Sequence, residues 1–64
     1  MPKAASTWPF VNDVIWRVRE LEDVTGEFEA ETTTANARRM RGIALLLIDA
    51  LDELIAARGG EHER

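Results

Sequence analysis

The chain contains no cysteine and no tyrosine, and its one histidine, His62, lies in the C-terminal segment "GGEHER". Without cysteine, the chain can form neither a disulfide nor a metal site with thiolate ligands. A lone histidine with no second nitrogen ligand is also a poor starting point for a zinc site. The sequence therefore predicts no metal and no cofactor.

Long apolar runs are also absent. The most apolar run, "IALLLI" at 43–48, ends at Asp49, which is far short of the ~20 residues that span a bilayer. The N-terminal segment "MPKAASTWPF" has one lysine and no apolar stretch of the kind found in signal peptides. These absences predict a cytoplasmic protein that does not enter a membrane.

The groups that usually perform catalysis are scarce. General acid–base catalysis needs a titratable group held in a cleft, whereas the carboxylates of this chain fall on the solvated sides of its expected helices. Asp49, Asp52 and Glu53 do not form the Glu-x-x-His pattern of a carboxylate-bridged metal bundle, and no glycine-rich phosphate loop is present. The sequence predicts a protein without enzymatic activity.

The 64 residues form one domain at most, with 12 acidic and 8 basic residues and a net charge of −4. A domain this small buries only about 60% of the surface of its unfolded chain. Because disulfides and metals are excluded, a partner chain is the remaining common source of stability. The acidic balance works against non-specific binding to nucleic acid.

Apolar residues from Phe10 to Leu21 recur at helical spacing, and Phe28 falls in the same stripe. This pattern predicts a helix over about 8–31, continuous through Gly26, after a loose arm at 1–6. Thr7 is the expected N-cap, followed by Pro9 in the first turn. The β-branched "TTT" at 32–34 predicts a turn, a second helix follows over about 35–58, and "RGG" begins a flexible tail at 59–64. The predicted fold is a single all-α domain, an antiparallel two-helix hairpin.

The apolar arc of the second helix spans roughly 160°, wider than the ~100° that one partner helix covers. We therefore predict that the hairpin self-associates into a helical bundle, with a homodimer favoured. The expected oligomer core is Met40, Ile43, Leu47, Leu51, Leu54 and Ile55. A groove for a cofactor or lipid, or for the helix of a different protein, remains an alternative use of the same arc.

Trp16 lies outside the apolar stripe of the first helix. The alternatives are that it packs at the rim of the oligomer core, or that it is a binding hot spot for another protein. The second alternative predicts a partner-binding surface of Trp8, Asn12, Trp16 and Arg19. Leu45 and Leu46, beside Gly42 on the polar side of the second helix, are either isolated exposed leucines or a second contact surface.

Acidic residues end the first helix and basic residues begin the second, so both clusters oppose the helix dipole. In an antiparallel hairpin the two ends are neighbours. We therefore predict cross-pairing of Glu27, Glu29 and Glu31 with Arg38, Arg39 and Arg41. The alternative, that the three arginines bind nucleic-acid phosphate, is opposed by the acidic residues that precede them.

Together these features predict a small non-enzymatic protein–protein interaction module that acts as a homo-oligomer: an adaptor, regulator or inhibitor of another protein. The alternatives are a nucleic-acid-binding regulator that uses Arg38, Arg39 and Arg41, or a purely structural oligomerisation element.

Overall fold

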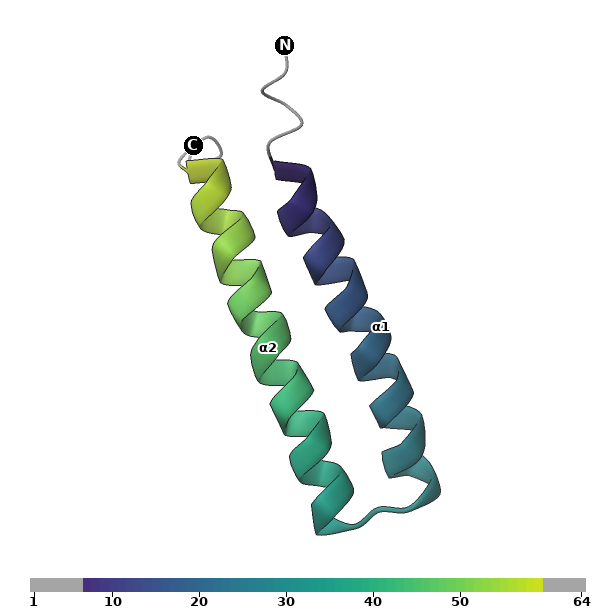
Figure 1. Ribbon diagram of the computed structural model, residues 1–64. Helices are drawn as coiled ribbons and strands as arrows, with labels where there is room; N and C mark the ends of the chain where they lie inside the picture. The colour runs from purple at the N-terminus through teal and green to yellow at the C-terminus, as the bar shows by residue number, and fades with distance from the viewer. Residues whose placement is uncertain (1–6, 60–64) are drawn as a thin grey trace.

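The computed structural model describes residues 7–59, which form two α-helices packed against each other and joined by a short turn. The helices are α1, Trp8–Ala30, and α2, Thr34–Arg58. They run antiparallel, so the start of α1 and the end of α2 lie at the same end of the molecule (Figure 1). The predicted all-α class and the packing of two helices are confirmed. The expected arm at 1–6 and the part of the expected tail at 60–64 lie outside the described residues.

The start of α1 differs from the sequence expectation in one respect. Thr7 occupies the N-cap position, but its side chain makes no capping hydrogen bond. Its backbone has φ −94° and ψ −6°, a helical conformation, whereas a capping side chain needs the extended conformation to reach the first free N–H groups. Pro9 in the first turn removes one of those donors. Farther along, α1 passes through Gly26 without a break.

The turn is held by hydrogen bonds at both helix ends. The extended backbone of Thr33 lets its Oγ1 accept from the Asn36 backbone N–H at 3.1 Å, so Thr33 caps α2. The Asn36 side-chain amide reaches back and donates to the backbone oxygen of Glu31 at 2.9 Å. The N–H of Glu31 in turn donates to the Glu27 carbonyl oxygen. These bonds satisfy backbone groups that helix ends otherwise leave to solvent.

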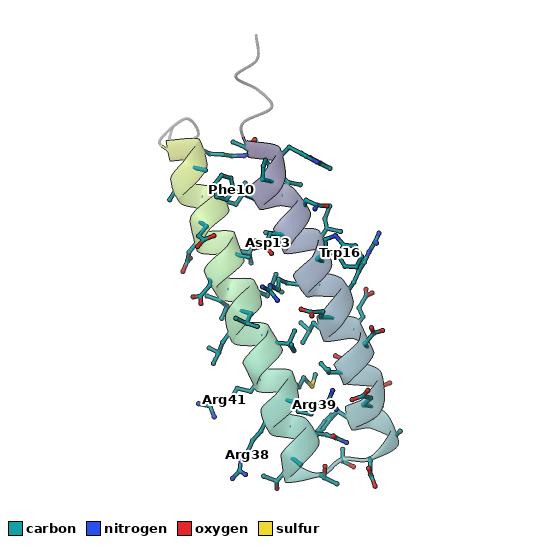
Figure 2. All side chains as sticks on the ribbon, viewed as in Figure 1. Phe10, Asp13, Trp16, Arg38, Arg39 and Arg41 are labelled. Atoms are coloured by element: carbon teal, nitrogen blue, oxygen red, sulfur yellow. The ribbon has the colours of Figure 1, made fainter. Side chains whose placement is uncertain are left out.

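Among the buried and half-buried residues of each helix, a series of six recurs at alternating intervals of four and three. This is the spacing of a coiled-coil contact line, which we call the seam. On α1 the seam consists of Phe10, Val14, Arg17, Leu21, Val24 and Phe28, and on α2 of Asn36, Met40, Ile43, Leu47, Ala50 and Leu54. Phe10 points from α1 toward α2 (Figure 2).

The hairpin is a rod with extents of 48 × 19 × 14 Å. Its radius of gyration is 14.9 Å, whereas a compact domain of roughly 50 residues would have a value of about 10 Å. Within residues 7–59 only Val24 and Ala50 are buried, at 8% and 4% exposure, and both lie in the seam. Two helices alone therefore bury a narrow strip and leave nine large apolar residues of this part of the chain exposed.

Candidate protein interaction surfaces

The surface of α1 that faces away from α2 carries an exposed tryptophan. Trp16 is 55% exposed and points away from α2 (Figure 2). The guanidinium carbon of Arg19 lies 5.5 Å from the centroid of the Trp16 ring. A cation at this distance is attracted to the ring face, by about 0.5–1 kcal/mol at an exposed site. Arg19 on the same helix thus lies over the Trp16 ring, and more than half of the Trp16 residue remains exposed.

The other residues of the predicted partner-binding surface are exposed as well. Trp8 is 59% exposed, and Asn12 and Arg19 are also open to solvent. Because Trp8, Asn12 and Trp16 are spaced by four residues, they follow one another along the outward side of α1. We call Trp8, Asn12, Trp16 and Arg19 the α1 outer patch. The structure brings the four residues onto one surface, and their role in binding stays a prediction.

Leu45 and Leu46 are 51% and 42% exposed, but they diverge around α2. Adjacent residues are rotated by about 100°. Leu45 lies opposite the seam, whereas Leu46 borders the edge of the seam. A Cβ placed on Gly42 would meet no atom within 4 Å. Within residues 7–59, the place that a Gly42 side chain would take is therefore open.

The expected oligomer core falls into two groups. Met40, Ile43, Leu47 and Leu54 lie in the seam and are partly covered within a single hairpin. Leu51 and Ile55 lie beside the seam and are 38% and 59% exposed. The wide arc on α2 thus contains a strip that contacts α1 and a second strip that α1 leaves uncovered.

The uncovered strip has a counterpart on α1. Several apolar residues directly follow a seam residue in the sequence. Because the two helices are antiparallel and face each other, positions that follow the seam on either helix lie on the same side of the hairpin. We call this the apolar side. It consists of Val11, Ile15 and Val18 on α1 and Ala44, Ile48, Leu51 and Ile55 on α2.

The opposite side is formed by residues that directly precede a seam residue, and it is mostly charged. We call it the polar side; its charged members are Asp13, Glu20, Asp23 and Glu27 on α1 and Arg39, Asp49 and Glu53 on α2. The ion pair between Arg39 and Glu27 crosses the hairpin here. Since this pair joins two positions that precede the seam, it supports the assignment of such positions to one side.

The predicted charge pairing at the turn is largely wrong. Arg39 pairs with Glu27, but among residues 7–59 Glu29, Glu31, Arg38 and Arg41 make no ion pair within 4.0 Å. The physical reason is rotation about the helix axes. Arg38 and Arg41 point away from α1, whereas Arg39 is directed toward it (Figure 2).

Arg17 is a residue whose position the sequence reasoning missed. It occupies the seam between Val14 and Leu21, with 32% of its side chain exposed. Its Nη1 lies 3.1 Å from Oε1 of Glu20, and its Nε lies 3.6 Å from Oδ1 of Asp13. The alternating spacing from Phe10 to Phe28 could have identified it, because that spacing requires a seam residue at position 17.

Within 7–59 no group of three or more histidine, cysteine or acidic residues is placed to hold a metal ion. A shallow depression beside the turn is lined by Glu27, Ala30, Glu31, Asn36 and Arg39. It is open; within it Arg39 pairs with Glu27, and the Asn36 side-chain amide donates to the Glu31 backbone oxygen. Neither described helix is long and apolar enough to cross a bilayer.

Comparison with protein-family models, with curated proteins and with solved structures finds no match to this chain.

Proposed function

We propose that the chain is a small non-enzymatic interaction module that acts as a homo-oligomer and binds another protein through the α1 outer patch. The observation that carries this proposal is Trp16, which is 55% exposed and has the Arg19 guanidinium over its ring. Tryptophan and arginine are among the residues most enriched at binding hot spots, where an apolar anchor is surrounded by polar groups.

The charge around the patch indicates the chemistry of the partner. α1 contains six acidic and two basic residues, whereas α2 contains three acidic and four basic ones. Glu20 and Asp23 are exposed on α1 close to Trp16 in sequence. An acidic surface attracts a basic one and speeds its association. The proposed partner therefore presents a basic surface with an apolar recess for the indole, which suits an inhibitor or adaptor that covers a positively charged site.

The test begins with capture of proteins from a native lysate on the immobilised chain, followed by titration of the purified partner. Trp16→Ala is expected to weaken binding by about 30-fold or more, the equivalent of a hot spot of about 2 kcal/mol. Leu45→Ala is the matched control, because Leu45 is similarly exposed but lies on α2. Affinity should also fall as salt is added, since the attraction is between exposed charges.

Equal binding by wild type and Trp16→Ala would contradict the proposal. Capture of nucleic acid that is lost in Arg38→Ala and Arg41→Ala would instead favour the nucleic-acid alternative. Few basic groups are free to contact phosphate on this part of α2. Arg39 is paired with Glu27, and the acidic residues Asp49 and Asp52 follow along the helix.

A further inference from the structure

The uncovered apolar side is the strongest remaining feature of the molecule. Among residues 7–59, nine large apolar residues are exposed, and five of them lie on this side: Ile15, Val18, Ile48, Leu51 and Ile55. These five residues lie in the half of the hairpin that is farther from the turn. Those on α1 belong to the first half of that helix, and those on α2 belong to the second half, which lies beside it. In the half near the turn, the same side carries Glu22 and Glu29 on α1 and Arg41 on α2.

We infer that this side binds a second copy of the chain, with the two-fold axis parallel to the helices and both turns at the same end. The inference deepens the self-association in the proposed function, because it assigns the surface and the orientation. Each α1 then packs beside the α2 of the other copy, and the four helices form a bundle in which all neighbours are antiparallel.

The orientation follows from the uneven distribution of apolar and charged residues. A two-fold axis along the helices places the apolar half of one hairpin on the apolar half of the other, while the rods overlap over their whole length. A two-fold axis perpendicular to the helices would place the two turns at opposite ends. If the rods then overlapped over their whole length, the charged half of each copy would lie on the apolar half of its partner. Burying unpaired charges against apolar surface is costly, so the parallel axis is favoured.

Charge complementarity near the turn supports the same arrangement. Glu22 precedes the end of α1 by eight residues, and Arg41 follows the start of α2 by seven. The two residues therefore lie at nearly the same height along the rod. With the axis along the helices, α1 of one copy lies beside α2 of the other, so Glu22 of each chain comes beside Arg41 of its partner. Opposite charges thus meet in the part of the face where apolar residues are missing.

The available area is sufficient for a stable dimer. α2 has 25 residues, so the shared face is about 37 Å long at about 1.5 Å per residue. The hairpin is 19 Å across. A face of this length and width has an area of about 700 Å² per copy, or about 1,400 Å² for both copies. Specific stable interfaces bury about 1,200–2,000 Å² in total. A second copy therefore covers the face that one hairpin leaves open.

Sedimentation over a wide range of concentration tests the surface. Ile55→Asp places a charge on the apolar side and is expected to weaken the dimer by at least about 100-fold. Leu45→Asp makes the same kind of change at a leucine that is 51% exposed and faces away from the seam. This control should remain a dimer with wild-type affinity. A wild-type chain that stays monomeric, or equal dissociation by both variants, overturns the inference.

Chemical cross-linking tests the orientation without disturbing the apolar residues. Since the chain has no cysteine, Glu22→Cys and Arg41→Cys each introduce one unique thiol at an exposed position. A mixture of the two variants, treated with a short bis-maleimide, should give a covalent dimer in much higher yield than either variant alone. A protein that sediments as a dimer but gives no such product overturns the orientation.

These outcomes can be separated from those for the α1 outer patch. Trp16→Ala should leave sedimentation and cross-linking unchanged while it weakens capture of the foreign protein. A dimer with the wrong cross-links overturns the present inference alone. A chain that is monomeric at every concentration also overturns the self-association in the proposed function.

Discussion

Replacement of Arg17 by leucine tests whether the seam is the main contact within the hairpin. Arg17→Leu turns the one charged seam residue of α1 into an apolar residue of the type that the seam spacing calls for. The substitution also removes the pairs with Asp13 and Glu20, whose side chains are 44% and 48% exposed. Stability should therefore change by the difference between added apolar burial and lost surface pairs.

The magnitude can be worked from the exposure of the side chain. Full burial of a leucine side chain contributes about 1.5–3 kcal/mol. Since 32% of the Arg17 side chain is exposed, a leucine there would gain roughly two thirds of that, or about 1–2 kcal/mol. The lost surface pairs cost ~0–1 kcal/mol each, and helix propensity is nearly equal for the two residues. The expected net effect is a stabilisation of about 1 kcal/mol, which raises the melting temperature by about 5 °C.

Urea unfolding followed by far-ultraviolet circular dichroism, at one fixed chain concentration, measures this effect. Arg19→Leu is the matched control because it makes the same chemical change on the outward side of α1. It should give no gain, since it also removes the contact with the Trp16 ring. If Arg17→Leu destabilised the protein by more than about 1 kcal/mol, or if Arg19→Leu stabilised it equally, the assignment of Arg17 to the seam would be refuted.

Three further substitutions probe local features of the hairpin by thermal and urea unfolding. Gly26→Ala should stabilise α1 by up to about 1 kcal/mol, because a Cβ there meets no atom within 4 Å; a loss of stability would show that α1 needs the glycine. Thr33→Ala should cost about 1 kcal/mol by removing the cap on the Asn36 N–H, and an unchanged midpoint would show that the cap contributes nothing. Glu27→Arg should cost about 0.5 kcal/mol, and addition of Arg39→Glu should restore most of that loss; a double variant no better than the single one would contradict the pairing.

The sequence was sufficient to predict two helices and a turn because the signals for them are local. The apolar stripe from Phe10 to Phe28, the β-branched "TTT" and the final glycines each act over a few residues. They locate α1 and α2 to within about one residue of their observed ends. Thr7 was an exception, because the capping bond depends on its backbone angles, which the residue type alone does not determine.

The details that were missed depend on rotation about the helix axes. The broad arc on α2 could not be divided into seam and apolar side until the direction of α1 was known. The direction of each arginine side chain depends on the same rotation. Arg39 points toward α1 and pairs with Glu27, whereas Arg38 and Arg41 do not face α1. The contact of Arg19 with Trp16 could have been predicted from the sequence, because residues three apart are neighbours on a helix surface.

The placement of the helix ends has a consequence for gene duplication and protein engineering. Trp8 begins α1 and Arg58 ends α2, and both lie at the end of the rod opposite the turn (Figure 1). In the inferred dimer, Arg58 of one chain is the neighbour of Trp8 of the other. A tandem fusion of two copies therefore needs only a short linker to produce a four-helix bundle in one chain. Such a fusion would replace an encounter between two molecules by a high effective concentration, and its melting temperature would no longer depend on dilution.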